Sequence, residues 1–357
     1  MRQYIYNLAT DKYKGLIPAL FKFFLFLFSL IYGLIIRFLI FFSLPFRRKL
    51  DCRVISVGNI TLGGTGKSTI VEYIARFLKE HGHKVAILSR GYGKLGTKNS
   101  KLGSAYSAMG DEPYMLSKKL QDIPVIVDPC RVRAAKKAIR DHSVDTVILD
   151  DGFQQWKIKK DMEIVAVDAT NPFGNRHMIP RGILREPISS LRRADIFVLT
   201  KGNLSKDVER ISEYLSMLDP QSLIAESIHK PLGFYDLHHP KETSDIYSLE
   251  GKTVTLLSGI GDPDSFENLI KILGIKVGLC FRFRDHHNYS NGDLKDIIEG
   301  SRSKNLDTII TTEKDAARLS DFVHPITDIR FLVLRIGLAI TKKEEEFRGR
   351  LLKLYSL

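Results

Sequence analysis

The chain has 357 residues, of which 44% are hydrophobic and 27% are charged, and its formal net charge is +13. This length provides an ample core and indicates two domains, or one domain with a large addition. The three cysteines, Cys52, Cys130 and Cys280, are widely spaced and form no C-x-x-C motif. That spacing argues against a disulfide framework or a zinc site, and it is typical of a protein in a reducing, cytosolic environment.

The N-terminal region is apolar and basic. Residues Leu16 to Phe46 are mostly hydrophobic and rich in phenylalanine, but the longest stretch without charge, Phe23 to Ile36, has only 14 residues. A simple membrane span needs roughly 20 residues, so we expect a shallow or tilted helix, lengthened where Arg37 snorkels. Residues 1–53 hold nine lysines and arginines against two aspartates, and this net +7 suits an anionic membrane surface.

Two other interpretations of this segment stay open, a helix buried in the protein core and a cleaved signal peptide. No small-x-small cleavage site follows the segment, and a glycine-rich loop begins soon after it. We therefore favour a membrane anchor. The basic triplet Arg47-Arg48-Lys49 directly follows the apolar residues, which predicts that the rest of the chain lies on the cytoplasmic side.

The most informative stretch is VISVGNITLGGTGKS, Val54 to Ser68. An apolar, β-branched run ends in a glycine-rich loop, and a Lys-Ser pair then opens a segment compatible with a helix. Backbone N–H groups of such a loop bind phosphate oxygens, Lys67 reaches the terminal phosphates, and the Ser68 hydroxyl ligates Mg²⁺. Thr61 stands where the usual motif has its first glycine, and an ordinary Gly-rich turn is the alternative. We predict that the loop binds a nucleoside triphosphate through Thr61, Gly63, Gly64, Thr65, Gly66, Lys67, Ser68 and Thr69.

A pair of carboxylates follows the apolar run Thr146–Leu149, which reads as a buried parallel strand. Asp150 and Asp151 come directly after it and precede Gly152. Taken alone, Asp-Asp-Gly is more often a turn. Downstream of a phosphate-binding loop, we expect one of these carboxylates to hold Mg²⁺ beside the Ser68 hydroxyl.

Beyond the loop, short apolar runs alternate with helical segments. This βαβ pattern predicts an α/β fold of the P-loop NTPase type, with a doubly wound, mostly parallel sheet and functional groups at the carboxyl ends of its strands. We expect helices over Ile70–Lys79, Tyr114–Gln121 and Val132–His142, and strands over Lys84–Ser89, Pro124–Val127, Thr146–Leu149, Glu163–Val167 and Ile196–Thr200.

A second, smaller α/β part is expected after the Pro- and His-containing stretch Lys230 to Ser248. Its expected strands are Thr253–Ser258, Lys276–Phe283, Asp307–Thr311 and Phe331–Arg335, and a charged helix follows from about Thr341. We therefore expect a membrane-associated helix in residues 1–50, a nucleotide-binding and catalytic domain in 51–235, and a C-terminal α/β domain in 236–357.

Eight motifs occur in an order that resembles one family. They are VGNITLGGTGKS, SRGYG (89–93), GDEP (110–113), DDGFQ (150–154), IPRGILREP (179–187), SGIGDPDSF (258–266), RDHHNY (284–289) and TTEKDAARL (311–319). Together they resemble the tetraacyldisaccharide 4′-kinases of lipid A biosynthesis, over roughly residues 44–338. The resemblance implies transfer of the γ-phosphoryl of ATP to the 4′-hydroxyl of a lipid-linked glucosamine disaccharide 1-phosphate. It also implies a P-loop catalytic core facing the cytoplasmic surface of the inner membrane, and we expect no nucleic-acid partner.

The resemblance implies a catalytic Asp–His pair made of Asp111 and His286. A base near the acceptor hydroxyl would help, because a sugar hydroxyl is a poor nucleophile at neutral pH. From the sequence alone, Asp111 reads rather as a helix N-cap, and Asp285-His286-His287 reads as a polar loop. In the catalytic interpretation, His286 orients Asp111 or accepts the proton itself, and Asp285 fixes the histidine tautomer. His287 is the less probable partner, since the family uses the first histidine.

Five arginines gather between residues 176 and 193, with Glu186 as the only acid. Such a segment is usually just solvated, but here ATP and the acceptor are both anionic, so Arg181 and Arg185 are candidates for bidentate phosphate contacts. Arg90 is a further phosphate-side candidate, and Glu186 is a candidate for the metal shell. We read Thr312 with Asp315 as a capping box that opens a helix rather than as part of the chemistry.

The sequence departs from the family pattern at two places in these motifs. The family loop usually reads GGTGKTP, whereas this chain has Ser68-Thr69, which keeps the hydroxyl. After DDGFQ the family usually has His, and Gln155 stands there instead. Two other nucleotide-binding classes fit less well. A partition-type ATPase needs a lysine where Leu62 stands, and the GTPase base-reading motif lacks its aspartate in Thr200–Asn203.

Overall fold

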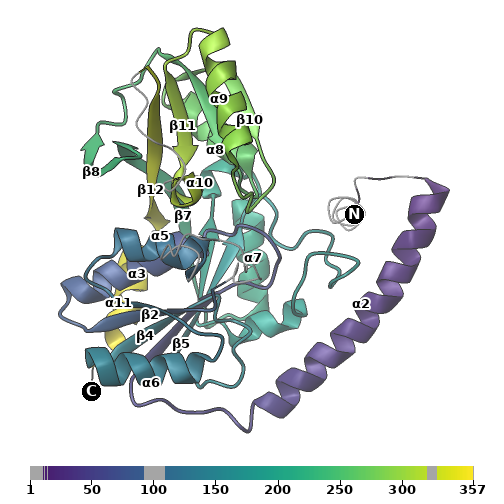
Figure 1. The fold of residues 1–357 in the computed structure, drawn as a ribbon. Coiled ribbons are helices and arrows are strands. Elements are labelled where there is room, and N and C mark those ends of the chain that lie inside the picture. The colour runs from purple at the N-terminus through teal and green to yellow at the C-terminus, as the bar shows by residue number, and fades with distance from the viewer. Residues whose placement is uncertain (1–10, 12, 14, 92–108, 320–327, 357) are drawn as a thin grey trace. The chain divides into compact units, whose positions relative to one another are not determined.

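The structure is a computed structural model that describes residues 11, 13, 15–91, 109–319 and 328–356. The chain divides into two compact units, each described here by itself (Figure 1). Unit 1 comprises Met1–Arg90, Asp122–Ile228 and Ala339–Leu357, and unit 2 comprises Gly91–Gln121 and His229–Leu338. The last two residues of the SRGYG motif lie outside the described residues.

Unit 1 contains a parallel sheet with the strand order β3-β2-β4-β1-β5-β6-β7. Its central strands are apolar on both faces, as expected for a sheet covered on both sides. The strands are β1 (Arg53–Gly58), β2 (Val85–Ser89), β3 (Val125–Val127), β4 (Thr146–Asp150), β5 (Met162–Asp168), β6 (Ile196–Thr200) and β7 (Leu223–Asp236).

Helices cover the sheet of unit 1 through two separate apolar clusters. In one cluster, alanines of α6 pack with Val147 and Leu149 of β4, and in the other, Leu215 of α7 packs with Val165 and Phe197. The helices of this unit after α2 are α3 (Lys67–Glu80), α6 (Arg131–His142), α7 (Val208–Leu218) and α11 (Glu344–Lys353), with the short 3₁₀ helices η1 (Ile188–Arg193) and η2 (Gly202–Leu204). The predicted doubly wound α/β fold is therefore confirmed.

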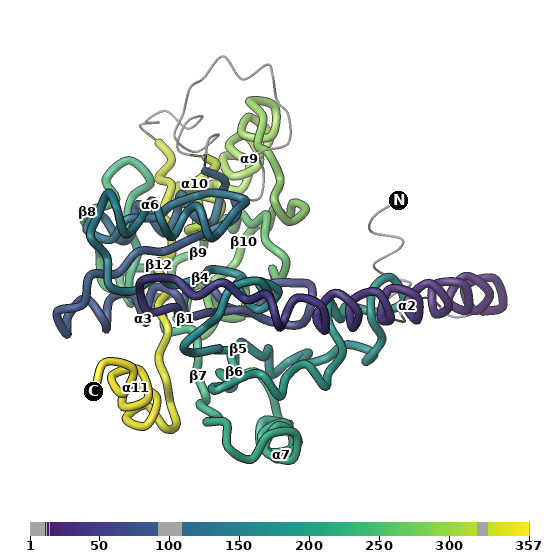
Figure 2. Tube along the Cα trace, turned by 90° about the horizontal axis from the view of Figure 1, so that it is seen from below, coloured from purple at the N-terminus to yellow at the C-terminus, as the bar shows by residue number. Residues whose placement is uncertain are grey.

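Helix α2 (Leu16–Ser43) is one unbroken rod in Figure 2. It is long and apolar enough to cross a membrane, with a mean hydropathy of 2.4 over its most apolar window. Most of its large side chains are exposed, and only Ser29, Gly33 and Ile36 are buried. On the side that faces the protein, Tyr32 Oη donates a hydrogen bond of 3.0 Å to the backbone oxygen of Arg185.

Unit 2 contains the parallel order β10-β9-β11-β12, and a short strand β8 pairs antiparallel with β7. Its strands are β8 (His239–Ser244), β9 (Thr253–Ser258), β10 (Lys276–Arg282), β11 (Thr308–Thr312) and β12 (Arg330–Lys342). Its helices are α5 (Asp111–Lys119), α8 (Pro263–Ile272), α9 (Asn291–Ser303) and α10 (Glu313–Leu319).

The compact units do not follow the linear division expected from the sequence. Residues 91–121 belong to unit 2 and residues 339–357 to unit 1. The chain returns because β12 is longer than expected and runs on through Lys342, after which α11 packs on α3, where Tyr73 Oη donates to Glu344. The expected boundary stretch, Lys230–Ser248, forms the end of β7 and the strand β8 rather than a linker.

Candidate active site

The glycine-rich loop joins β1 to α3 in unit 1. Gly66 is the N-cap of α3 with φ +78°, and Gly63 has φ +115°, so both use backbone conformations that favour glycine. An added Cβ at Gly63 or Gly64 would meet nothing within 4 Å, so the space over the loop is open. A hydrogen bond of 3.0 Å from Thr200 Oγ1 to Thr65 O ties the loop to the end of β6. These features suit a loop that binds phosphate.

Asp151 holds two cations beside this loop. Its carboxylate accepts hydrogen bonds of 2.8 and 3.1 Å from the Arg185 guanidinium, and Lys67 Nζ lies 3.6 Å from Oδ1. Lys67 Nζ also donates to Asn59 Oδ1 at 3.2 Å. Burial works to raise the pKa of Asp151, but the charges of Lys67 and Arg185 outweigh it and hold the pKa below its ordinary value. The side chains of Lys67, Arg185 and Asn59 thus lie together beside the loop. Two adjacent cations at such a place suit the binding of a phosphate group.

Backbone pairing places Arg185 in this cluster. Leu62 N–H donates to Ile183 O at 2.8 Å, and Arg185 N–H donates to Ile60 O at 2.6 Å. The segment 183–185 therefore runs alongside the start of the loop. Tyr32 of α2 binds the same segment through the backbone oxygen of Arg185. Arg185 was one of three arginines predicted to contact phosphate, and its position fits that role.

The oxygen donors predicted for Mg²⁺ lie around the same loop. Ser68 is in the first turn of α3, and Asp150 is buried at the end of β4, where its Oδ2 accepts a 3.0 Å hydrogen bond from Ser89. The Thr69 hydroxyl instead donates to Gly66 O at 2.8 Å. No cluster of three His, Cys, Asp or Glu side chains suited to a metal occurs among the described residues. A hydroxyl and carboxylates still fit Mg²⁺, which takes few protein ligands and fills its shell with phosphate and water.

Glu186, which the sequence predicts for the metal shell, has three protein partners in the structure. It is fully buried, and its Oε1 accepts hydrogen bonds from Gln154 (3.1 Å) and Trp156 (3.0 Å). Its Oε2 accepts a 2.9 Å hydrogen bond from Arg193. These three hydrogen bonds hold the carboxylate against the segment after β4, and a place for Glu186 in the metal shell stays a prediction.

Arg181, the second predicted phosphate-binding arginine, contacts the chain before α2. Arg181 binds Asp11 at 2.9 Å, and Lys22 binds the same carboxylate at 2.7 Å. Burial opposes ionisation of Asp11, but Lys22, Asn175 and Arg181 outweigh it and lower its pKa to about 2. Arg90 directly follows β2 and is exposed. Arg185 is thus the predicted arginine whose guanidinium binds Asp151 in the structure.

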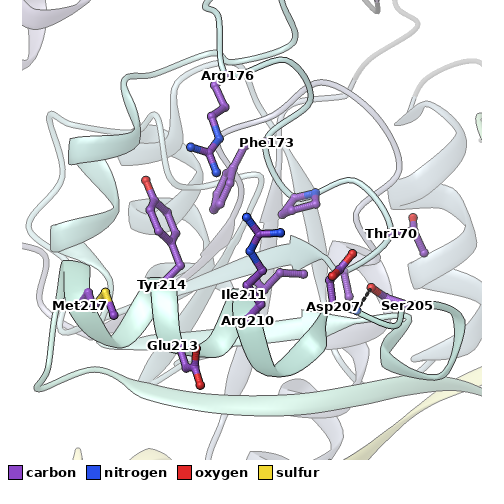
Figure 3. Close-up of a pocket in the computed structure, with 12 residues that line it drawn as sticks. Thr170, Phe173, Arg176, Ser205, Asp207, Arg210, Ile211, Glu213, Tyr214 and Met217 are labelled. Atoms are coloured by element: carbon purple, nitrogen blue, oxygen red, sulfur yellow. Dashed lines mark hydrogen bonds between the residues drawn. The ribbon is translucent and has the colours of Figure 1, made fainter.

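A cleft of 440 Å³ lies along α7 in unit 1 (Figure 3). Arg176, the first arginine of the basic segment, reaches it and lies 5.5 Å from the centre of the Tyr214 ring. Arg210 adds a second guanidinium, but Asp207 and Glu213 line the same cleft. Because the charges balance, the cleft is not a dedicated anion site.

The predicted Asp–His pair is formed within unit 2. His286 Nδ1 lies 2.8 Å from Asp111 Oδ2, although the two residues are 175 positions apart. Asp111 is the first residue of α5, and the N-cap is Gly110, so the interpretation of Asp111 as a cap is wrong. The hydrogen bond to Asp111 outweighs burial and raises the pKa of His286 above its ordinary value.

The neighbours of His286 have different partners. Asp285 Oδ2 is 3.8 Å from His286 Nε2, beyond hydrogen-bond distance, so Asp111 rather than Asp285 fixes the tautomer. With a proton on Nδ1, Nε2 is the ring nitrogen that can accept another. His287 stacks on Phe283 and lies 3.2 Å from Asp293, which agrees with its exclusion from the pair.

Sequence reasoning missed Arg318, whose Nε donates to Asp111 Oδ2 at 2.7 Å. It lies on α10, whose N-cap is the predicted one: Thr312 Oγ1 accepts from Asp315 N–H at 3.2 Å. A signal was present, because Asp315 and Arg318 stand three residues apart on one helix face within the TTEKDAARL motif. In this motif, only Thr312 and Asp315 were interpreted from the sequence, as a capping box.

Comparison with known proteins identifies the family of this chain. The family described as "Tetraacyldisaccharide-1-P 4'-kinase" matches residues 21–356. The tetraacyldisaccharide 4′-kinase of Halothermothrix orenii is 34% identical over 96% of this chain and 95% of its own. That of Elusimicrobium minutum is 35% identical over 83% of this chain and 81% of its own.

A solved structure is also similar over nearly the whole chain. It is LpxK from Aquifex aeolicus in complex with ATP, with a TM-score of 0.71 and 27% identity. The match covers 92% of this chain and 98% of that one. Because the family model matches residues 21–356 and the relative from Halothermothrix orenii is 34% identical over 96% of this chain, this chain belongs to the tetraacyldisaccharide-1-P 4′-kinase family.

Proposed function

We propose that this protein transfers the γ-phosphoryl group of ATP to the 4′-hydroxyl of a tetraacyl glucosamine disaccharide 1-phosphate, a step of lipid A biosynthesis. The observation that carries the proposal is the cluster of Lys67, Arg185 and Asn59 around Asp151, directly beside the open glycine-rich loop. Family membership and the ATP complex of the Aquifex aeolicus relative support both the reaction and the nucleotide.

Lys67 and Arg185 are placed to exchange the Asp151 carboxylate for a phosphate group. Asp151 presents two anionic oxygens to Lys67 and Arg185, which is what a phosphate group also presents. In the proposed reaction, both cations turn from this carboxylate to the β- and γ-phosphates. The loop amides and the positive end of α3 add to the binding, and Arg185 stabilises charge on the transferred group.

Ser68, Asp150 and Asp151 are the residues that would hold Mg²⁺. When bound, the ion neutralises charge on the β- and γ-phosphate oxygens. Asp151 becomes available for this role when its two cations move to phosphate. Glu186 is kept as a further candidate for the metal shell, and Gln154, Trp156 and Arg193 hold its carboxylate in place.

We assign removal of the hydroxyl proton to Asp111 and His286 acting as one unit. The 2.8 Å hydrogen bond between them lets either member respond to a proton gained by the other. His286 has φ +59°, which is an uncommon backbone conformation for a residue other than glycine. Asp285 assists from 3.8 Å as a second negative charge that favours a protonated imidazole.

The acceptor is an amphiphile, and the N-terminus is built for a membrane. The exposed apolar surface of α2 and the net +7 of residues 1–53 support anchoring at the cytoplasmic face of the inner membrane. Arg90 is retained as a candidate for the acceptor phosphate, while Arg181 is assigned to hold the chain before α2 through Asp11. Nucleic acid is not a proposed partner.

The test uses the purified full-length chain in detergent with γ-labelled ATP and a panel of lipid disaccharides, with and without Mg²⁺. Label is expected in a tetraacyl disaccharide 1-phosphate only when Mg²⁺ is present. A matched disaccharide that already carries a 4′-phosphate is the control and should take no label. Labelling of that control, or ATP hydrolysis without any labelled lipid, would contradict the assignment.

A further inference from the structure

Arg318 contacts the carboxylate of the Asp–His pair from the side of the protein core. Its Nε and Nη2 each lie 2.7 Å from Asp111 Oδ2, the same oxygen that faces His286 Nδ1. The guanidinium is 2% exposed, whereas the His286 side chain is half exposed. Arg318 therefore approaches Asp111 from within the protein and leaves the histidine as the outward member.

The same guanidinium also reaches the backbone that carries His286. Arg318 Nη1 donates to Gly259 O at 3.0 Å, and the His286 N–H donates to that oxygen at 3.2 Å. One planar group thus spans the carboxylate of one partner and a carbonyl that anchors the other. Lysine cannot reproduce this, because its single ammonium lacks the fixed fork of donors.

A buried network holds the guanidinium in place. Asp315 Oδ1 accepts from Arg318 Nη1 at 3.2 Å and from Tyr289 Oη at 2.9 Å. Its Oδ2 accepts from Gly259 N–H at 3.1 Å and from the Thr312 hydroxyl. Since Asp315 lies in the first turn of α10, where its N–H donates to the capping Thr312 Oγ1, the network fixes Arg318 against a helix rather than a loop.

We propose that Arg318 is a positioning residue that sets the distance and orientation of Asp111 and His286 for proton removal. The proposal rests on the proposed function of that pair. Arg318 acts on the geometry of proton transfer, so its substitution should alter turnover. ATP binding should stay unchanged, because the glycine-rich loop belongs to unit 1. The groups that face His286 are Asp111, Asp285 and Arg318.

The test compares Arg318→Lys with Arg302→Lys in the full-length enzyme. Both changes keep the positive charge, and Arg302 makes a similar two-pronged contact, but with the exposed Asp328 on the surface of the same unit. Arg318→Lys should lower kcat about tenfold or more with an unchanged KM for ATP, since small misplacements of catalytic groups carry costs of this order. Arg302→Lys should match wild type.

A double-mutant cycle separates positioning from a general structural role. In a His286→Ala background, Arg318→Lys should cause little further loss, because there is no pair left to position. Full additivity, or normal turnover in the single variant, would overturn the proposal. A downfield proton resonance from the His286 ring N–H, assigned by its loss in His286→Ala, should weaken in Arg318→Lys. Normal turnover in His286→Ala itself would refute the proposed role of the pair instead, and an unchanged resonance would refute positioning.

Discussion

Asp151 pairs with Lys67 across 3.6 Å at the mouth of the glycine-rich loop and binds Arg185 through both of its oxygens. All three side chains are largely buried, and Asp151 itself has a positive φ of +53°. The phosphate-binding cations are thus held in advance by an internal anion. In the proposed function, nucleotide binding displaces that carboxylate, and this competition has measurable consequences.

Asp151→Asn should separate binding from catalysis. Without the internal anion, Lys67 and Arg185 no longer have to leave a partner, so ATP measured without Mg²⁺ should bind a few-fold more tightly, about 1 kcal/mol. Turnover should fall because a proposed metal ligand is lost. Isothermal titration and steady-state kinetics measure the two effects. Asp122→Asn, which removes the exposed partner of Lys79, is the control and should change neither. Weaker ATP binding in Asp151→Asn would refute the competition.

Lys67→Ala should abolish transfer and weaken ATP binding, because no other residue of the loop brings a positive charge to the terminal phosphates. Lys79→Ala at the other end of α3 is a matched control and should behave as wild type. Asp150→Ala should lose activity in a way that added Mg²⁺ restores only in part. Near-normal turnover by Lys67→Ala would remove the nucleotide assignment.

The limits of sequence reasoning are visible in the partners of particular residues. The loop and the acidic strand end carry their signal in contiguous residues, so they could be found before any fold was known. Asp111 and His286 are 175 positions apart, and only the resemblance to the family implied that they form a pair. The engagement of Glu186 could not be found in this way, because Trp156 lies 30 residues away and nothing in the sequence marks the carboxylate as buried. Arg318 and Asp111 are 207 residues apart, and only the packing of α10 with α5 joins them.

Similar limits explain why Asp111 was predicted as the cap of α5 and why the predicted domain boundaries differ from the compact units. Asp-Glu-Pro fits a capped first turn equally well with the cap one residue earlier, and glycine at position 110 takes φ +87° there. The expected strand ended at Arg335, but β12 runs on through Lys342, past Thr341, where the final helix was expected to begin. That extension carries the chain from unit 2 into unit 1.

Deleting residues 1–46 should move the protein from the membrane fraction toward the soluble one, because the exposed apolar surface of α2 is lost. High salt should loosen what binding remains, since the basic residues after the helix interact through screened charges. Fractionation and a salt wash measure both effects. A truncated protein that stays fully bound in high salt would show that the anchor lies elsewhere.

Tyr32→Phe tests whether the anchor helix supports the phosphate site. The change removes only the hydroxyl that donates to Arg185 O, on the segment paired with the loop. Loss of one such hydrogen bond, about 1 kcal/mol, should raise the KM for ATP roughly fivefold while membrane association stays the same. Tyr247→Phe, at an exposed tyrosine of unit 2, is the control. An unchanged KM would mean that α2 acts as an anchor alone.

Asp111→Ala and His286→Ala should each lower kcat by about 10²- to 10⁴-fold, the usual contribution of a general base, and barely affect ATP affinity. Because the pair acts as one unit, the double variant should be little worse than the worse single variant. Additive losses would exclude a coupled pair. Wild-type turnover in either single variant would remove that residue from the mechanism.

The pH dependence gives the pair a second, independent signature. The hydrogen bond to Asp111 raises the pKa of His286 above its ordinary value of 6.5, so the acid limb of the kcat profile should have its midpoint above that value. Asp111→Asn weakens the bond and should move the limb to lower pH.

The pair should affect stability in the opposite direction from activity as the pH rises. A raised pKa in the folded state means that the pair stabilises the protein fully below pH 6.5 and loses this contribution as the pH rises through the folded pKa. Thermal melts of wild type and His286→Ala should therefore differ most at acidic pH and converge at alkaline pH. A difference that grows with pH would show that the hydrogen bond does not favour the protonated imidazole.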